Sequence, residues 1–547
     1  MSDNLISVNN VSVNFDYQEN FISKKQKIHA VNNINIQIKK GSFFGLVGES
    51  GSGKTTLGRA ILGANKISSG NVIFHDDDRN YDLTNMNKQD LKEYRKKAQL
   101  IFQDPYAALS PRMTVRDIIA EPLEVMKITN SRQETDEKVR DIAAKCRLNI
   151  EHLRRFPHAF SGGQRQRISI ARALVSNPKF IVADESLPVH VLSGPDLMCK
   201  SIDKFHPIKK KGDAFLINSP YHGCSHAADH TIVVPVIDSK GKHHFNVCVK
   251  AHQADIGNSK PTTYMADVED VYEEGALIFP GTKIQENYSD IKDIIRMCEI
   301  RFRVPKQWKG DYLAMISSAR IGERELIQLG YEIGWKKLKT FTHKWFNYSE
   351  LRMREAIKEM PSKKIKISTK HDPFPGLPKE GLQINISLNI DNIKGTLSID
   401  LRDNPDNLPC GLNLTEATAI SGAMTGIFNS IDHTVPPNTG SFRCVNIILR
   451  EGCIVGIPKH PYSCSLGTSN ICDRLENAVV QAFAKLGEGW GMAECGPLLP
   501  PATGVISGFD ERSKENFVNE IFLFHTGAGA SPQADGWLTL TGMGSAG

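Results

Sequence analysis

The chain has 547 residues, of which 40% are hydrophobic and 23% are charged, and its net charge is +6. This length suggests two to four domains, and this composition excludes a wholly disordered or fibrous chain. No run of about eighteen uncharged apolar residues occurs, so we expect no membrane span. The first residues lack a basic stretch followed by an apolar one, so we expect no signal peptide and a cytoplasmic location.

Charge and cysteine content both change near residue 186. Residues 1–186 carry 28 Lys and Arg against 21 Asp and Glu, whereas the rest of the chain carries 39 against 40. This basic excess fits a phosphate ligand or an acidic partner and is too weak to indicate nucleic acid. Ten of the eleven cysteines follow residue 186, and no CxxC pair occurs. Scattered cysteines in odd number are typical of buried thiols in a reducing compartment.

The predicted elements alternate in the first third of the chain and form longer blocks afterwards. Residues 30–75 are predicted as strand, glycine-rich loop, helix and strand, and residues 83–160 as mostly helical. A helix ending near 174–175 leads into a buried strand at 179–183. Residues 211–260 predict three strands, 308–360 predict helices, and 365–547 mix strands with at least two helices. The basic stretch 362–370 is interpreted as a solvated connector, with a partner-docking strip as the alternative.

A phosphate-binding motif lies at Gly48-Glu49-Ser50-Gly51-Ser52-Gly53-Lys54-Thr55. It follows the apolar run 43–47 and opens a helix, which is the context that GxxxxGK[ST] requires. Backbone N–H groups of such a loop surround phosphate oxygens at a helix N-terminus. The lysine neutralises β- and γ-phosphate charge, and the threonine hydroxyl binds Mg²⁺. The motif therefore predicts an ATP and Mg²⁺ site formed by Gly48, Gly51, Gly53, Lys54, Thr55 and Thr56.

Three shorter motifs follow in order. An amide side chain in the run 101–105 can sense the metal, and the run 161–164 reads Ser-Gly-Gly-Gln. The apolar strand 180–183 ends in two carboxylates, of which the first is placed to hold Mg²⁺ and the second to orient the attacking water. The predicted residues are Gln103, Ser161, Gly163, Gln164 and Asp184, with Glu185 as a catalytic residue.

Together these motifs make residues 4–186 resemble the ATP-binding subunit of ABC transporters of the oligopeptide and dipeptide importer class. The resemblance implies permease partners and a peripheral position at the inner face of the cell membrane. The family continues with an aspartate-containing D-loop and a switch histidine, whereas this chain continues with residues 187–192, Leu-Pro-Val-His-Val-Leu. We therefore predict nucleotide binding without steady ATP turnover.

A predicted β-hairpin centred near Lys240 gathers three possible metal ligands. Residues paired across it have numbers that sum to about 480, which sets residue 252 opposite 228, one step from Asp229. Opposed Cβ atoms lie about 5 Å apart, so His252 reaches Asp229, and His226 lies in the preceding loop. Two imidazoles and one carboxylate leave positions for water and substrate and suit Mn²⁺, Fe²⁺ or Zn²⁺.

Other polar residues of this segment receive lesser roles. Asp255 is a candidate for orienting an imidazole from outside the ligand set, and we assign it to the catalytic group. The remaining histidines are expected at the surface: His222, His230, His243 and His244. The alternative interpretation is that the three candidate ligands are polar residues satisfied by hydrogen bonds, without a metal.

Residues 187–547 resemble the hydantoinase B family, which includes N-methylhydantoinase, acetone carboxylase α-type subunits and the B half of 5-oxoprolinases. The resemblance rests on Pro188-Val189-His190, on the histidine and aspartate positions above, on 436–441 and 456–461, and on 526–530 with 534–537. It implies a metal-dependent subunit acting on a cyclic amide or small carbonyl substrate. It also implies a partner hydantoinase A-type subunit that binds ATP and phosphorylates the substrate.

We therefore predict an α/β P-loop domain, an incomplete ABC ATPase, followed by a mixed α+β hydantoinase B-like region. The predicted boundaries are 1–186, 187–375 with the metal site, and 376–547. The predicted function is that of an oligomeric, metal-dependent hydrolase or carboxylase subunit. Two alternatives stay open: the ATP-binding subunit of a peptide importer with impaired hydrolysis, and a chimeric gene product with neither activity.

Overall fold

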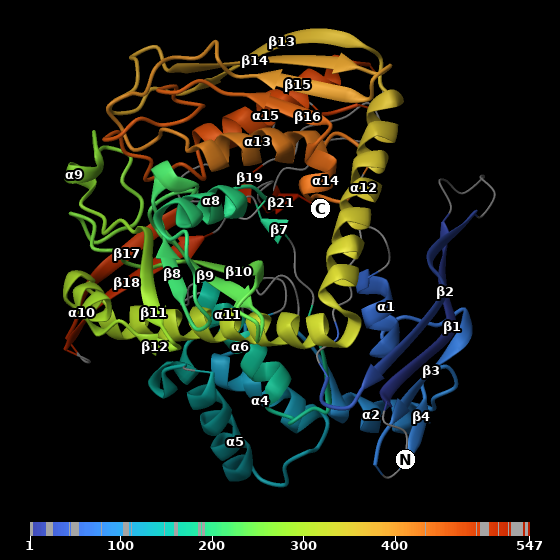
Figure 1. Ribbon diagram of the computed structural model, residues 1–547. Coiled ribbons are helices and arrows are strands. Elements are labelled where there is room, and N and C mark those ends of the chain that lie inside the picture. Colours follow the sequence, from blue (N-terminus) through green and yellow to red (C-terminus); the bar gives the residue numbers. More distant parts are fainter. Residues whose placement is uncertain are drawn as a thin grey trace. The chain divides into compact units, whose positions relative to one another are not determined.

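The structure is a computed structural model, shown in Figure 1, and it divides into two compact units, Met1–Ser186 and Leu187–Gly547. It describes residues 4–17, 26–42, 44, 54–77, 79–101, 109–110, 112–146, 148–157, 162–183, 187–188, 192–432, 434–487, 490–492, 503–511, 514–522, 525–526, 540–541 and 545–546. In these ranges, no helix combines the length and the hydropathy that crossing a bilayer requires.

The first unit begins with an antiparallel sheet whose strand order is β2-β1-β3-β4. Its strands are β1 (Asn4–Tyr17), β2 (Gln26–Lys39), β3 (Ser69–His75) and β4 (Asn80–Asp82). Alternate residues such as Val72 and Phe74 point inward, because successive side chains of a strand face opposite sides. Helices α1 (Lys54–Ile61) and α2 (Lys88–Lys97) flank this sheet and complete its apolar core, with Tyr94 fully buried.

A second part of this unit is mostly helical. Its helices are α4 (Val115–Val125), α5 (Arg132–Lys145), the 3₁₀ turn η1 (Ile150–Arg154) and α6 (Gly162–Leu174). Strand β5 (Ala98–Ile101) pairs in parallel with β6 (Phe180–Ala183). The prediction of a buried strand here is only partly right, because Ile181 is 38% exposed. Within the described ranges, β6 has β5 as its one neighbour, which leaves part of the strand uncovered.

The second unit contains a five-stranded sheet ordered β10-β9-β8-β11-β12. Its strands are β8 (Ala214–Ile217), β9 (Asp229–Ile237), β10 (His243–His252), β11 (Pro280–Glu286) and β12 (Ser289–Asp290), and the first three confirm the prediction for 211–260. Ile232 and Val234 of β9 face a core that includes Trp308 of α11 (Pro305–Ile333). Val233 faces the opposite side, where Met198 of α8 (Pro195–Phe205) lies.

The other sheet of this unit is ordered β13-β14-β15-β16. It comprises β13 (Lys363–His371), β14 (Leu382–Asp391), β15 (Thr396–Asp400) and β16 (Val445–Ile448), and it packs on α13 (Glu416–Phe428) and α15 (Ile471–Ala484). This sheet begins at Lys363, before the boundary at 375 that the sequence suggested. The stretch predicted as a connector is thus an edge strand, and exposed lysines on an edge oppose pairing with other chains.

Two long helices connect the sheets. Helix α11 ends at Ile333 and α12 (Trp335–Lys358) begins two residues later, and Figure 1 shows them running in clearly different directions. The break falls at Gly334, whose φ of +86° favours glycine. The shorter elements are β7 (Leu187–Pro188), η3 (Pro220–His222), α9 (Val271–Glu274), α10 (Lys292–Arg301), α14 (Thr439–Phe442), β17 (Thr503–Asp510), β18 (Glu515–Phe522), β19 (His525–Thr526), β20 (Leu540–Thr541) and β21 (Ser545–Ala546).

Candidate metal centre

The β9–β10 hairpin sets the geometry of the site. His252 pairs directly with Asp229, whereas the predicted hairpin register sets it opposite residue 228. A register shift between His243 and Phe245 accounts for the difference, because one extra residue in β10 moves every later pair by one. The ring of His244 stacks on Trp335 with centroids 3.8 Å apart, which holds the side chain at the bulge.

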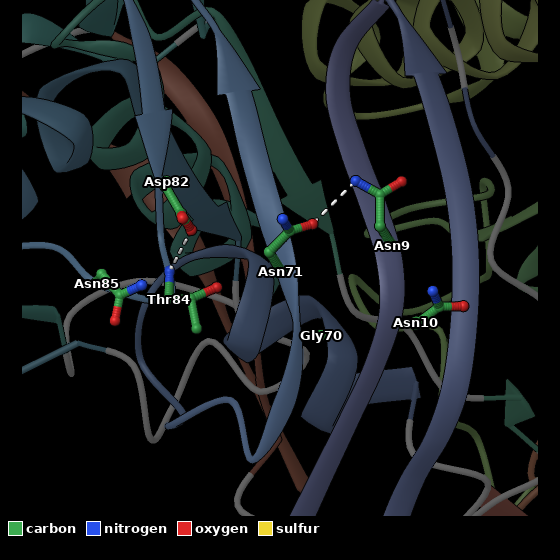
Figure 2. Close-up of a pocket in the computed structure, with 7 residues that line it drawn as sticks. All are labelled: Asn9, Asn10, Gly70, Asn71, Asp82, Thr84 and Asn85. Carbon is green, nitrogen blue, oxygen red and sulfur yellow. Dashed lines mark hydrogen bonds between the residues drawn. The ribbon is translucent and has the colours of Figure 1, made fainter.

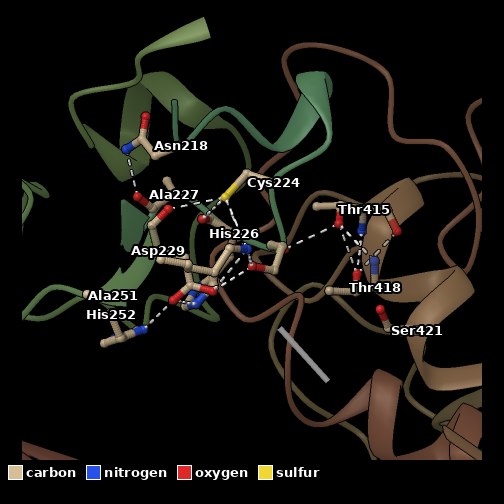
Figure 3. A network of polar contacts seen from close by, with 12 residues as sticks. Asn218, Cys224, His226, Ala227, Asp229, Ala251, His252, Thr415, Thr418 and Ser421 are labelled. Carbon is tan, nitrogen blue, oxygen red and sulfur yellow. Dashed lines mark hydrogen bonds and ion pairs between the residues drawn. The ribbon is translucent and has the colours of Figure 1, made fainter. Parts of the chain in front are cut away.

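His226, Asp229 and His252 converge as the sequence predicts. One ligand atom from each lies within 4.8 Å of the others, and Figure 3 shows the three side chains turned toward one another. Asp229 Oδ1 is 3.1 Å from His226 Nε2 and 3.0 Å from His252 Nδ1. His226 and Asp229 are buried, whereas the side chain of His252 is 20% exposed, so the cluster has one accessible side.

A backbone hydrogen bond fixes the tautomer of His226, that is, which of its two ring nitrogens carries the hydrogen. His226 Nδ1 lies 3.1 Å from the carbonyl oxygen of Ser465, and a carbonyl can only accept, so Nδ1 carries the hydrogen. In the neutral imidazole, Nε2 then presents a lone pair toward Asp229 Oδ1. A lone pair and a carboxylate oxygen at 3.1 Å repel each other unless a proton or a cation lies between them. A proton on Nε2 satisfies this contact, and so does a divalent cation, for which two imidazoles and a carboxylate are a suitable donor set.

The second oxygen of Asp229 is held by other groups. The Ser225 hydroxyl donates to Asp229 Oδ2 at 2.5 Å, and Lys250 Nζ donates to the same hydroxyl at 2.8 Å. Lys250 Nζ also lies 3.7 Å from Oδ2, and its side chain is 6% exposed. The carboxylate is thus oriented with Oδ1 toward the imidazoles. Partners outside the ligand set orient metal ligands in this way.

Distant segments hold the loop that carries His226. The Asn218 amide is fully buried, donates to the carbonyl oxygens of Ala227 and Leu277, and accepts from the N–H of Phe279. The Thr415 hydroxyl at the start of α13 donates to the carbonyl oxygen of Ser225 at 3.3 Å. These bonds fix the loop from both sides, so His226 points at Asp229 before any ligand binds.

An aromatic ring covers the two imidazoles. Tyr264 stacks on His252 with centroids 5.3 Å apart and lies 6.0 Å from the ring of His226. The Thr263 hydroxyl lies 3.3 Å from His252 Nε2. Sequence reasoning missed Lys250, Ser225, Tyr264 and Ser465. Only Lys250 carried a signal, since it shares the strand face of His252 at a spacing of two.

His230 and Asp255 both differ from their predicted environments. His230 is not at the surface: it is buried, burial lowers its pKa to about 3, and Trp308 Nε1 donates to its Nδ1. Asp255 accepts from the backbone N–H of Arg303 and, at 2.9 Å, from its guanidinium. Both carboxylate oxygens of Asp255 are thus occupied by Arg303. Asp255 is therefore held by Arg303, and the metal centre proposed below consists of His226, Asp229 and His252.

The predicted nucleotide site lies largely outside the described residues. This holds for Gly48, Gly51, Gly53, Gln103, Ser161, Asp184 and Glu185, and for the side chains of Lys54, Thr55 and Gln164. Gly163 belongs to the first turn of α6. Helix α1 begins at Lys54, which agrees with the predicted opening of a helix there. Thr56 is half-buried in its first turn.

The first unit also has an open pocket of about 380 Å³, shown in Figure 2. Among the described residues, its lining is polar and mostly uncharged, with Asp82 as the one carboxylate. The lining residues are Asn9, Asn10, Gly70, Asn71, Asp82, Thr84 and Asn85.

The chain belongs to the hydantoinase B/oxoprolinase family, whose sequence profile matches residues 156–546. Two solved structures share the fold of this region. An ATP-dependent caprolactamase from Pseudomonas jessenii is 23% identical with a TM-score of 0.58, covering 66% of this chain and 61% of that one. A structure described as nucleotide-free acetone carboxylase is 14% identical with a TM-score of 0.56, covering 64% and 47%.

Residues 31–187 match the ABC transporter family. The oligopeptide transport ATP-binding protein OppF of Streptococcus mutans is 49% identical over 183 residues, which is 34% of this chain and 56% of that protein. OppF of Bacillus subtilis is 44% identical over 170 residues, which is 31% and 55%. The chain thus spans about half the length of these curated relatives. The predicted pairing of an ABC ATP-binding domain with a hydantoinase B-like region is confirmed.

Proposed function

We propose that the second unit is the metal-dependent catalytic part of an ATP-linked hydrolase or carboxylase that acts on a cyclic amide or small carbonyl substrate. The observation that carries the proposal is the convergence of His226 Nε2, Asp229 Oδ1 and His252 Nδ1 within 4.8 Å. Family membership supports the same function. The caprolactamase and the acetone carboxylase, by their descriptions, act on a cyclic amide and a small ketone with ATP.

The residues around the cluster define how it would work. Ser465 fixes the hydrogen of His226 on Nδ1, and Ser225 with Lys250 orients Asp229. Mn²⁺, Fe²⁺ or Zn²⁺ bound there would supply Lewis-acid polarisation of a substrate carbonyl. Tyr264 limits the approach over the imidazoles. The open side of His252 is then the direction from which substrate reaches the cluster.

Metal content tests this proposal directly. The wild-type chain should hold about one divalent ion per chain, and His226→Ala and Asp229→Ala should each lose most of it. His222→Ala is the matched control, because His222 lies in the same loop region and bonds Ser219 instead of the cluster. Elemental analysis of the purified proteins measures the content. If wild type and all three variants held the same, sub-stoichiometric amount of metal, the proposed metal site would be refuted.

A partner subunit follows from the same proposal. We infer that ATP chemistry on the substrate is supplied by a hydantoinase A-type subunit, since the chain belongs to the hydantoinase B/oxoprolinase family and both solved structures that share its fold are described as ATP-dependent. Co-purification with such a subunit should give ATP-dependent turnover that the isolated chain lacks. The chain on its own is expected to bind metal without consuming ATP.

The second candidate function belongs to the first unit. The contiguous Gly48–Thr55 motif and the 49% identity to an importer ATP-binding protein favour nucleotide binding there. We infer that hydrolysis is not sustained, because the residues that follow 187 match a different family. Association with ABC permease subunits at the membrane is the corresponding proposal for partners.

A fluorescent ATP analogue tests this second candidate. Wild type should bind it in the presence of Mg²⁺, and Lys54→Ala should weaken binding at least tenfold. Lys40→Ala, an exposed lysine paired with Asp77, serves as the control. Binding that survives Lys54→Ala unchanged would refute the assignment of the phosphate-binding loop.

A further inference from the structure

Two thiols from different elements lie in contact, and one of them belongs to the strand that carries His252. Cys199 of α8 and Cys248 of β10 have their sulfur atoms 3.8 Å apart, and both residues are only half-buried. The two thiols pack against the apolar cluster formed by Met198, Ile202 and Phe215, among others. Disulfide formation shortens such a contact to about 2 Å, which a side-chain rotation or a small shift of the helix can supply.

Cys199 is chemically distinct from the other described cysteines. The contact with the Cys248 thiol lowers the pKa of Cys199, and an Asn246 bond acts in the same direction. The pKa of Cys248 is raised by the same contact. In the rest of the described chain, burial raises the pKa of the cysteine thiols, as at Cys224 and Cys472. A thiolate is the attacking species in disulfide exchange, so Cys199 is the residue suited to react first.

The pair joins the two elements that border the cluster. Cys248, Lys250 and His252 lie at every second position of β10 and therefore share one face of the strand. On this face, Lys250 contacts Ser225 and His252 contacts Asp229. Helix α8 packs on the loop that leads to His226: a Cβ at Gly223 would lie 2.5 Å from Leu197. A bond between α8 and β10 would therefore tie together the supports of both candidate metal-binding histidines.

We propose that Cys199 and Cys248 form a thiol–disulfide pair, oxidised by a small disulfide such as glutathione disulfide to an intrachain bond between α8 and β10. The Cys199 thiolate attacks one glutathione sulfur, forms a mixed disulfide and releases one glutathione thiolate. That thiolate takes the proton of Cys248, whose sulfur then attacks the Cys199 sulfur and releases the second glutathione. Two protein thiols are oxidised, and one glutathione disulfide is reduced to two thiols.

Peptide mapping of the native chain tests the proposal. After treatment with glutathione disulfide and alkylation of the remaining thiols, wild type should lose two thiols and yield a peptide pair joined through Cys199 and Cys248. Cys248→Ser should stop at the mixed disulfide, with one glutathione on Cys199. Cys199→Ser should form neither product, and Cys224→Ser, which alters a fully buried thiol, should behave as wild type.

The outcome is separable from the proposed function. A wild-type chain that keeps both thiols after oxidation, or that links other cysteines, would overturn the pair whatever its metal content. The mapping on wild type is decisive even if a serine variant fails to fold.

Discussion

Two apolar strands, one in each unit, differ sharply in burial. Strand β6 carries Ile181 at 38% exposure and, in the described ranges, pairs with β5 alone. Strand β9 lies between β8 and β10, and all nine of its residues are buried. Both segments are apolar runs, so composition does not separate them. Neighbours on both edges and cover on both faces decide whether such a run is enclosed.

The enclosed sheet allows the second unit to bury polar groups near its site. Asp229, His230 and Glu274 are each at most 2% exposed. Burying such groups costs free energy unless hydrogen bonds or opposite charges compensate, and the same burial strengthens their electrostatic interactions. The contrast between the two strands therefore bears on function, because the candidate ligand Asp229 opens β9.

The largest expected effect comes from a charge placed inside β9. Val233 is 1% exposed and faces the apolar cluster of α8, so Val233→Lys buries an unpaired ammonium group. We expect destabilisation of the second unit by more than about 4 kcal/mol and loss of soluble, folded protein. Soluble yield and circular dichroism measure this, with Val233→Ile as the control. A variant that melts like wild type would show that the strand is not enclosed.

A pH-dependent effect is expected at Glu274. Burial raises the pKa of Glu274 from 4.5 to about 7, although the Ser463 hydroxyl donates to it at 2.6 Å. The folded state thus holds the proton more tightly than the unfolded state, so stability is full below pH 4.5 and falls as the pH rises through 7.

Glu274→Gln should remove this loss. We expect the variant to be more stable than wild type by about 3 kcal/mol at pH 8 and by less than about 1 kcal/mol at pH 5. Urea unfolding at the two pH values measures the difference. Glu273→Gln, at the exposed neighbouring position, should show no such pH dependence. An equal effect of Glu274→Gln at both pH values would contradict the raised pKa.

A smaller effect is expected at Lys250. Its ammonium group lies 3.7 Å from Asp229 Oδ2 and competes with a divalent cation for that carboxylate. Lys250→Met should therefore raise metal affinity about tenfold, which corresponds to about 1.4 kcal/mol. Competition with a chelator measures it, and Lys242→Met in the exposed turn is the control. A fall in affinity would mean that orienting Ser225 and Asp229 matters more than the repulsion.

The smallest effect is expected at β6. Because Ile181 is already 38% exposed, Ile181→Lys can leave its ammonium group in water. We expect the stability of the first unit to change by no more than about 0.5 kcal/mol. Thermal unfolding of the variant beside Val233→Lys makes the comparison direct. Unfolding of the first unit by this change would show that β6 is covered as fully as β9.

Local patterns carried most of the fold prediction. The three strands at 211–260 and the helices at 308–360 follow from periodicity and turn residues, and both occur. The hairpin register was predicted to within one residue, since it depends chiefly on the turn. The difference of one residue in the register comes from the bulge near His244. The His244 ring packs there on Trp335, which belongs to a helix some ninety positions later. No feature of the hairpin sequence encodes that contact.

The sequence by itself determined which residues can carry chemistry: the contiguous glycine-rich loop, and a histidine, an aspartate and a histidine brought together by one short turn. Only the tertiary structure decided how those groups are oriented. The Ser465 carbonyl that sets the tautomer of His226 lies 239 positions away, and Thr415 holds the same loop from 190 positions away. Such contacts depend on how separate sheets and loops pack, and packing between distant segments leaves no periodic pattern along the chain.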